Sequence, residues 1–243
     1  MAFGAKVAAI EFAGDAIRVV VARTGGGRPK LLEAHEATAV YEAPEQRRES
    51  LVHTLDAVLE KLRHRPASYV LCVNTGMATL RTLTVPFKGA ARVAKAVPLE
   101  LEPYLPFPME ELMVDFSVIK ETNGETEVFA MGMRRKHMEE LLSVLEEVGI
   151  DPEAVVLDTA GLTALWMSGR RAGKGLEAVL HLRAQGCELA VTYQHRLAFI
   201  RHITLPGGLV VENPQRLARE VQNTLRAFMA QWKSEGEIDR LSM

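Results

Sequence analysis

A glycine-rich stretch, Gly169–Gly175 with the sequence GRRAGKG, resembles a phosphate-binding loop. In such loops backbone N–H groups surround the phosphates, a lysine contacts them, and the next Ser or Thr binds magnesium. Here the spacing is one residue too short, and a glycine follows Lys174 where the hydroxyl residue should be. We therefore interpret this stretch as a solvent-exposed loop.

Three histidines, His181, His195 and His202, fall within one short region and could in principle hold a metal ion. Their spacing matches no metal-site pattern, and no Cys-x-x-Cys pair accompanies them. We interpret them as strand or loop residues with ordinary hydrogen bonds. The chain also lacks a G-x-S-x-G nucleophile motif, because Ser168-Gly169 occurs without the rest of it.

The composition is that of an ordinary globular protein, with 48% hydrophobic and 25% charged residues in 243. This length suits one large domain or two modest ones. A net charge of −2 argues against nucleic acid or anionic lipid as the main partner. Cys72 and Cys187 lie in strand-like runs, which indicates buried free thiols in a reducing compartment. With no long apolar run and no export signal, we expect a cytosolic chain.

Two similar hairpins, Ala5–Arg23 and Leu180–Thr192, organise the predicted fold. Each consists of two apolar strands around a tight turn, and the first turn is Ala13-Gly14-Asp15. Aligned residue on residue, Ile10, Glu11, Phe12, Gly14, Asp15 and Val19 correspond to Leu180, His181, Leu182, Ala184, Gln185 and Leu189. The repetition suggests two related half-structures.

The chain between the hairpins alternates strands and helices, which is typical of a mixed α/β architecture. We expect strands at 30–38, 69–73, 80–85 and 154–157. We expect helices at 44–63, 135–148 and from Asp158 or Thr159, as the cap, to Trp166. After the second hairpin come a strand at 196–203, a helix capped by Asn213 with Pro214 at its first position, and a strand from Ile238.

A proline-rich segment interrupts this pattern, because five of the eleven prolines fall between Pro86 and Pro108. A short helix at 88–101 leads into Tyr104-Leu105-Pro106-Phe107-Pro108. A hairpin follows, with strands at 112–119 and 127–133 joined across Asn123-Gly124, a strong turn signal. Prolines stiffen the chain and remove backbone donors, so we expect an inserted subdomain with a rigid edge.

The order of these elements resembles the actin-like fold of sugar kinases, Hsp70 and actin. More closely, the chain resembles two bacterial assembly proteins, the L component of the type II secretion platform and the M protein of the type IV pilus. The segments Ala9–Arg18, Leu99–Phe116, Met131–Leu165 and Leu180–Gly208 carry the resemblance, and LPFP followed by VGIDPEAV is its most specific part.

This resemblance implies an α/β, ribonuclease H-like fold with two related mixed-sheet lobes. We expect a first subdomain at 1–86, an inserted subdomain at 87–133, bridging helices at 134–176, and a second lobe at 177–243. That second lobe lacks the family's adenosine-binding Gly-Gly loop, so we expect it to be incomplete.

The resemblance also implies two phosphate loops, and both depart from the pattern of ATP-using relatives. The first consists of Glu11, Ala13, Gly14 and Asp15, and the second of His181, Arg183, Ala184, Gln185 and Gly186. Glu11 and His181 stand where metal-binding aspartates are expected, and Ala13 and Arg183 where glycines are usual. Without those acids a phosphoryl-transfer enzyme lacks its main electrostatic stabilisation. We therefore expect a vestigial nucleotide site, no enzyme activity, no cofactor and no metal.

By this resemblance the function is that of a non-catalytic scaffold, at the cytoplasmic face of the inner membrane, that links a secretion ATPase to platform proteins. The chain's length favours the secretion component. The alternative is an ATP- and magnesium-binding pilus assembly protein that grips a short peptide of a membrane partner. A sugar or acetate kinase would need an acid at His181. The predicted partner edge is Pro98, Tyr104, Leu105, Pro106 and Phe107, which could also be a plain packed insert, and a homodimer stays open.

Overall fold

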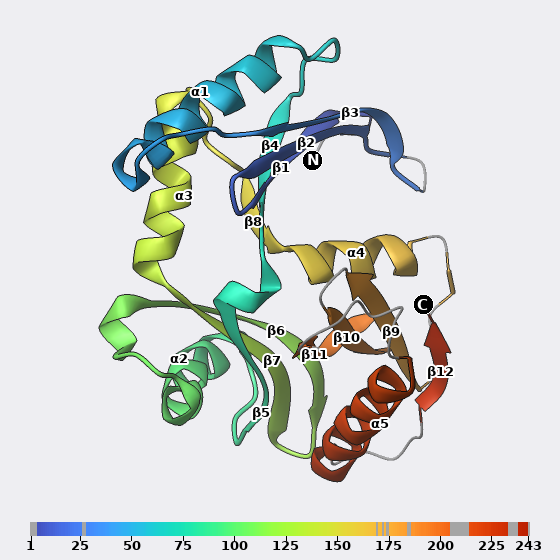
Figure 1. The fold of residues 1–243 in the computed structure, drawn as a ribbon. Coiled ribbons are helices and arrows are strands. Elements are labelled where there is room, and N and C mark those ends of the chain that lie inside the picture. The colour runs from blue at the N-terminus through green and yellow to red at the C-terminus, as the bar shows by residue number, and fades with distance from the viewer. Residues whose placement is uncertain are drawn as a thin grey trace. The chain divides into compact units, whose positions relative to one another are not determined.

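The computed structural model describes residues 4–25, 28–168, 170, 171, 173, 175–183, 186–204, 214–232 and 238–242 (Figure 1). The chain forms two compact units. One consists of Met1–Met77 with Arg135–Gly169, and the other of Ala78–Arg134 with Arg170–Met243. Among the described helices, none combines the length and apolar composition that crossing a bilayer requires.

The first unit is built on one mixed sheet of five strands in the order β3-β2-β1-β4-β8. The strands are β1 (Lys6–Ala13), β2 (Ala16–Arg23), β3 (Lys30–Thr38), β4 (Ser68–Val73) and β8 (Ala154–Leu157), and the helices are α1 (Arg47–Glu60), α3 (Arg135–Glu147) and α4 (Asp158–Met167). β1 is antiparallel to β2 and parallel to β4. Alternate residues of β1 and β2, including Ile10, Ile17 and Val19, are fully buried.

Helices pack on this sheet through apolar side chains that recur at helical spacing. Leu51, Leu55 and Val58 of α1 are buried, and α1 contacts β2, β3 and α3. α3 is followed by Gly149, whose φ of 75° suits the end of a helix, and Ile150 N–H donates to the carbonyl of Leu145. α4 contacts β4 and β8.

The second unit contains two sheets, with strand orders β5-β7-β6 and β11-β10-β9-β12. The first comprises β5 (Ala78–Val85), β6 (Leu112–Thr122) and β7 (Glu125–Arg134), with α2 (Ala90–Leu101). The second comprises β9 (Leu176–Arg183), β10 (Gly186–Tyr193), β11 (Arg196–Thr204) and β12 (Ile238–Ser242), with α5 (Pro214–Gln231). The turn between β6 and β7 is Asn123-Gly124, with φ values of 39° and 96°, as predicted.

The three-stranded sheet is packed on both faces, as the alternating side chains of β7 show. Val128 and Ala130 join a core with α2, whereas Phe129, between them, joins the core of β9–β11 and α5. The last helix, with the adjoining Trp232, buries one apolar stripe: Leu217, Val221, Phe228 and Trp232 are buried and Leu225 packs against them.

The two hairpins have the predicted correspondence, and their cross-strand registers agree. Ile10 pairs with Val19, and Leu180 pairs with Leu189. β1 then pairs in parallel with β4, as β9 does with β12. The two sheets also share a β-bulge, because the register shifts between Val21 and Ala22 and again between Val191 and Thr192.

The bulge adds one residue to the third strand in each half. Leu32 is the extra residue of β3, and Ala198 is the extra residue of β11. Matching strand order, register and bulge support the prediction of two related lobes.

Some predicted boundaries differ from those observed. The helix predicted at 44–63 is a short 3-10 turn, Pro44–Gln46, followed by α1. The N-cap position of α4 is Leu157 instead of Asp158 or Thr159, because the extended strand β8 leads directly into the helix. Asn213 and the whole of Leu205–Gly208 lie outside the described residues, as do Gly169, Ala172 and Lys174 of the glycine-rich stretch. The two compact units divide the chain more coarsely than the four predicted subdomains, which stay a prediction.

Candidate functional site

The first predicted phosphate turn has both of its acidic side chains engaged in contacts within the first unit. Gly14, with a φ of 69°, turns the chain between β1 and β2. Arg47 Nε donates to Asp15 Oδ1 at 2.8 Å, and the hydroxyl of Tyr41 donates to Asp15 Oδ2 at 3.0 Å. Arg47 also donates to the carbonyl of Gly14 at 2.8 Å. The turn is therefore fixed to the segment that leads into α1, and both carboxylate oxygens of Asp15 are occupied.

Glu11 belongs to a row of charges across β1, β2 and β3. It lies opposite Arg18, which lies opposite Glu36. Arg18 Nε donates to Glu36 at 2.6 Å and Nη1 to Glu11 at 3.3 Å, and these two bonds raise the pKa of Arg18. A metal ion at Glu11 would have to compete with a guanidinium that is already paired.

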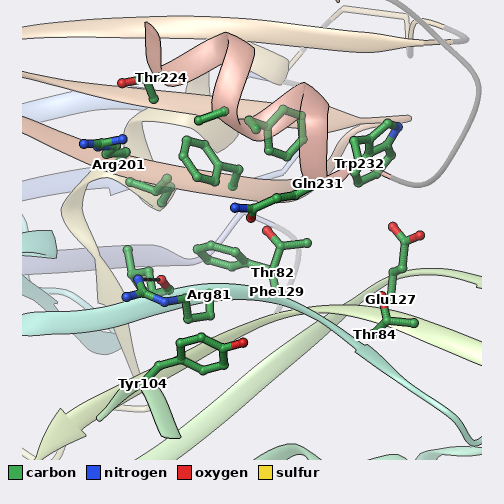
Figure 2. A pocket seen from close by; sticks show the side chains of 15 residues that line it. Arg81, Thr82, Thr84, Tyr104, Glu127, Phe129, Arg201, Thr224, Gln231 and Trp232 are labelled. Carbon is green, nitrogen blue, oxygen red and sulfur yellow. Dashed lines mark hydrogen bonds between the residues drawn. The ribbon is translucent and has the colours of Figure 1, made fainter. Parts of the chain in front are cut away.

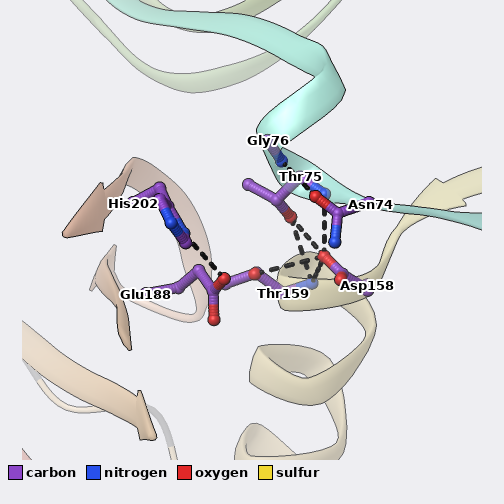
Figure 3. A network of polar contacts seen from close by, with 7 residues as sticks. All are labelled: Asn74, Thr75, Gly76, Asp158, Thr159, Glu188 and His202. Carbon is purple, nitrogen blue, oxygen red and sulfur yellow. Dashed lines mark hydrogen bonds and ion pairs between the residues drawn. The ribbon is translucent and has the colours of Figure 1, made fainter. Parts of the chain in front are cut away.

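The second half has a corresponding row, with one acid between two histidines. His181 lies opposite Glu188, and Glu188 lies opposite His202, across β9, β10 and β11. Glu188 is only 1% exposed, and its Oε1 is 3.0 Å from Nδ1 of His202 (Figure 3). The acid of this row therefore stands on the middle strand, whereas the acids of the first row stand on the outer two.

The second turn is described in part. Arg183 ends β9 opposite Gly186, which begins β10, and Ala184 and Gln185 lie outside the described residues. The neighbouring Cys187 is buried, and burial, helped by the charge of Glu188, raises the pKa of its thiol to about 11. Among the described residues no group of three or more His, Cys, Asp or Glu side chains could hold a metal ion.

A buried carboxylate at the start of α4 joins two segments of the first unit (Figure 3). Asp158 is 6% exposed, and its Oδ1 accepts hydrogen bonds from the backbone N–H of Thr75 at 3.0 Å and of Thr159 at 2.7 Å. The hydroxyl of Thr75 also donates to it. This network fixes the turn after β4 to the amino end of α4. The sequence indicated Asp158 only as a helix cap, and no local motif pointed to Thr75.

The predicted partner edge lies in the second unit, where its side chains have different environments. Pro98 lies within α2 and Pro106 is exposed. Leu105 packs against the core of α2 and the three-stranded sheet. Tyr104 and Phe107 are 51% and 38% exposed, and each has an arginine over its ring, Arg81 at 5.3 Å and Arg134 at 4.2 Å. The segment is thus anchored by one leucine and presents two aromatic rings to solvent.

A cavity of about 640 Å³ lies within the second unit, between β5, β7, β11 and α5 (Figure 2). Its lining combines aromatic side chains with a few polar groups, a composition typical of binding pockets. The lining includes Arg81, Tyr104, Glu127, Phe129, Phe199, Arg201, Thr224, Phe228, Gln231 and Trp232. The sequence did not predict this site, because its residues come from five separate elements: β5, the 3-10 turn Glu102–Tyr104, β7, β11 and α5 with the adjoining Trp232. Among the described lining residues, Tyr104 is the one that the sequence assigned to a binding site, as part of the predicted partner edge.

Comparison with known proteins identifies the family. Residues 11–235 match the model of the type IV pilus assembly protein PilM family, and the chain belongs to that family. A search of curated protein sequences found no significant match.

Solved structures show the fold. A structure of the PilM–PilN type IV pilus biogenesis complex has 18% sequence identity and a TM-score of 0.75, over 98% of this chain and 88% of that chain. The cytoplasmic domain of EpsL, an inner-membrane component of the type II secretion system of Vibrio cholerae, has 14% identity and a TM-score of 0.57, over 98% and 85%.

A Bacteroides thetaiotaomicron protein with an actin-like ATPase fold has 13% identity and a TM-score of 0.52, over 92% and 78%. These similarities confirm the predicted actin-like fold and the predicted resemblance to pilus and secretion assembly proteins.

Proposed function

We propose that this chain is a non-catalytic, cytoplasmic scaffold of type IV pilus assembly, which connects an assembly ATPase with components of the inner-membrane platform. Membership of the PilM family supports assembly over catalysis. It also favours the pilus system over the secretion platform that we expected from the chain's length. The similarity to EpsL keeps the secretion platform as the second candidate.

The observation that carries the non-catalytic part of the proposal is the engagement of Glu11 and Asp15. Glu11 is paired with Arg18, and both oxygens of Asp15 accept hydrogen bonds from Arg47 and Tyr41. Phosphoryl transfer needs carboxylates that can hold magnesium at the phosphates. Neither Glu11 nor Asp15 can bind magnesium without first losing these hydrogen-bond and ion-pair partners.

Calorimetry with Mg-ATP tests this part of the proposal. We expect no measurable heat of binding at millimolar nucleotide, and we expect Arg18→Gln, which releases Glu11, to remain inactive in ATP hydrolysis. Micromolar affinity that depends on magnesium would instead support the nucleotide-binding alternative, in which a membrane partner's peptide is the bound segment.

The partner edge is tested by changing the two exposed rings. A charge at Phe107, as in Phe107→Asp, should weaken capture of the cognate assembly ATPase by about tenfold or more, because an aromatic contact is replaced by a group that must be desolvated. Tyr104→Asp should act in the same direction. His181→Ala should leave capture unchanged, since His181 belongs to the vestigial nucleotide site.

Phe87→Asp is the matched control, because Phe87 is a similarly exposed ring of the same unit outside this edge. If Phe87→Asp and His181→Ala weaken capture while Phe107→Asp does not, the assignment of the edge is wrong. Failure of the unaltered chain to capture the ATPase at micromolar concentration would reject the ATPase as a partner.

A further inference from the structure

Three cations stand directly opposite one another at one end of the sheet of the first unit. Lys6 of β1 pairs with Arg23 of β2, and Arg23 pairs with Lys30 of β3. Arg23 and Lys30 are exposed, and Lys6 is half-buried. In the described part of the chain none of the three forms an ion pair. Like charges directly opposite each other destabilise a sheet, so this row needs another explanation than the fold.

The same three strands carry a second row, in which the charges balance. Glu11, Arg18 and Glu36 lie opposite one another, and Arg18 pairs with both acids. A positive row across these strands is therefore no requirement of the sheet. A negatively charged surface outside the chain would relieve the repulsion in the row Lys6–Arg23–Lys30.

Further cations surround this row. Lys61 and Arg63 line a cavity beside β3. Arg65 follows, and the N–H of Ala67 donates to the carbonyl of Lys6 at 2.7 Å, so this segment also lies beside β1. Cations near the carboxyl end of a helix stabilise its dipole, which accounts for Lys61 after α1 but not for the row. The basic patch, as we call these exposed or half-buried cations together, consists of Lys6, Arg23, Lys30, Lys61, Arg63 and Arg65.

The neighbouring acids do not neutralise the basic patch. Both oxygens of Glu33 already accept hydrogen bonds, from β3 itself and from the segment after α1. Asp151 and Glu153 lie on the far side of β4, where the N–H of Glu153 donates to the carbonyl of Tyr69 at 2.9 Å. Glu60, which ends α1, can offset one cation. The net charge of −2 is a sum over the whole chain, so it is compatible with a positive surface at this end.

An exposed apolar side chain accompanies these cations. Leu31 follows Lys30 in β3 and is 61% exposed. The backbone of a nucleic acid offers such a side chain no apolar contact. A bilayer takes it up among the headgroups while basic side chains bind the lipid phosphates. The combination favours a lipid surface over nucleic acid.

We propose that the basic patch holds the first unit against an anionic lipid bilayer, with its cations at lipid phosphates and Leu31 in the headgroup region. Guanidinium groups bind phosphate through charge-assisted hydrogen bonds. Attraction between exposed charges is screened by salt, so this contact is reversible and weakens as salt rises. The inference rests on the proposed scaffold function, which puts the chain beside the inner membrane, and it adds the surface that meets the lipid.

Sedimentation of the full chain with vesicles tests this inference. The probe vesicles contain phosphatidylethanolamine and phosphatidylglycerol, and the control vesicles contain phosphatidylcholine in place of phosphatidylglycerol. We expect binding to the anionic vesicles at low salt and affinity about tenfold lower, or less, at about 0.3 M salt, where the Debye length is short. The neutral vesicles should bind the chain about tenfold more weakly or not at all.

Substitutions in the row give the decisive comparison. Arg23→Gln and Lys30→Gln should each weaken binding to the anionic vesicles by about fivefold, the contribution of one cation at such a surface. Lys136→Gln is the matched control, because Lys136 is an exposed lysine of the same unit in the first turn of α3. α3 leads toward the start of β8, at the patch end of the sheet, so its first turn lies at the other end. Lys136→Gln should leave the affinity unchanged.

The stability of these variants separates binding from a structural role. Because Arg23 stands between two other cations, Arg23→Gln should leave the urea midpoint of the folded chain unchanged or raise it, while vesicle binding weakens. A fall in the midpoint that matches the loss of binding would show that Arg23 serves the fold, and it would contradict the proposal.

The apolar contact has its own test. Leu31→Ser should weaken vesicle binding by the same factor at low and at high salt, because burial of an apolar side chain is not screened. Val40→Ser is the matched control, since Val40 follows the other end of β3 and is 84% exposed. Equal effects of the two substitutions would contradict the placement of Leu31 in the headgroups.

Four further results would overturn the proposal. They are equal binding to neutral and anionic vesicles, unchanged affinity in both Arg23→Gln and Lys30→Gln, tighter binding of double-stranded DNA than of anionic vesicles at the same salt, and release from vesicles by millimolar inorganic phosphate. The third would assign the basic patch to nucleic acid, and the fourth to a single phosphate group.

Vesicle binding and ATPase capture are separate measurements. Failed vesicle binding with intact capture rejects this inference and leaves the scaffold function standing. Failed capture with intact vesicle binding rejects the ATPase as a partner and leaves the membrane contact standing.

Discussion

At the scale of single residues, the pKa of Glu33 in β3 lies well below the ordinary value of a glutamic acid. Burial raises the pKa of its carboxyl group. Hydrogen bonds from His35, from the backbone N–H groups of Arg63 and His64, and from the His64 ring lower it by more than burial raises it, so that the pKa is about 2. These bonds fix the end of α1 to β3.

The folded protein should therefore lose stability as the pH falls from 4.5, the ordinary pKa of a glutamic acid, toward 2. A carboxylate with a lowered pKa in the folded state stabilises it above the unfolded pKa, and protonation removes that contribution. We expect Glu33→Gln to be less stable than the unaltered chain at pH 6 and to show a smaller further loss between pH 4.5 and 2. Urea denaturation at several pH values measures this, and parallel curves for the two proteins would contradict it.

At the scale of the elements, the LPFP segment is held by a close approach to β7. A Cβ atom added at Gly132 would lie 2.9 Å from Cδ2 of Leu105 and 3.5 Å from Cδ2 of Leu101. The glycine thus makes room for the leucine that anchors the segment.

Gly132→Ala should destabilise the chain by about 1–2 kcal/mol, because Leu105 has to move or leave its place. In a Leu105→Ala background the same change should cost clearly less, since the obstructing side chain is absent. Chemical denaturation of the four proteins of this cycle gives the coupling energy. Additive effects would show that Gly132 does not act through Leu105. Gly161→Ala is the control, as a Cβ there meets no atom within 4 Å.

Local sequence patterns predicted most of the elements but not the site that they enclose. Period-two and helical spacing and the Asn123-Gly124 turn correctly indicated strands and helices, because these features depend on neighbouring residues. The cavity depends on Arg81, Glu127, Arg201 and Trp232, which lie on four elements far apart in the chain. A lone arginine or glutamate in a strand has no local signal of a ligand, so this site required the folded arrangement.

At the scale of the whole molecule, the two compact units should respond separately to a change in one of them. Asp158→Ala removes the acceptor of four hydrogen bonds from Thr75 and Thr159 and should destabilise the first unit by about 3 kcal/mol. Native-state hydrogen exchange should become faster in β4 and α4 and change little in β9–β11.

Glu153→Ala, an exposed change beside β8, is the matched control and should leave both units unaffected. A uniform rise in exchange across both units after Asp158→Ala would show instead that the molecule opens as one cooperative body.

The duplication of the lobes was predictable from the sequence because the hairpins kept their apolar spacing while nearly every side chain differed. The sequence did not predict that the acids stand on the outer strands in the row Glu11–Arg18–Glu36 and on the middle strand in the row His181–Glu188–His202. This difference appears only once the third strand is placed beside the second.

The extra residue of β11 attaches one sheet of the second unit to the other. The carbonyl of Ala198 accepts a hydrogen bond from the hydroxyl of Thr82 on β5 at 2.5 Å. Every amino acid carries a carbonyl, so this hydrogen bond does not depend on the side chain of Ala198, which is itself buried in the core. A search for invariant side chains would therefore not show that residue 198 is a hydrogen-bond acceptor. It would find the hydroxyl at position 82 without showing which group that hydroxyl binds.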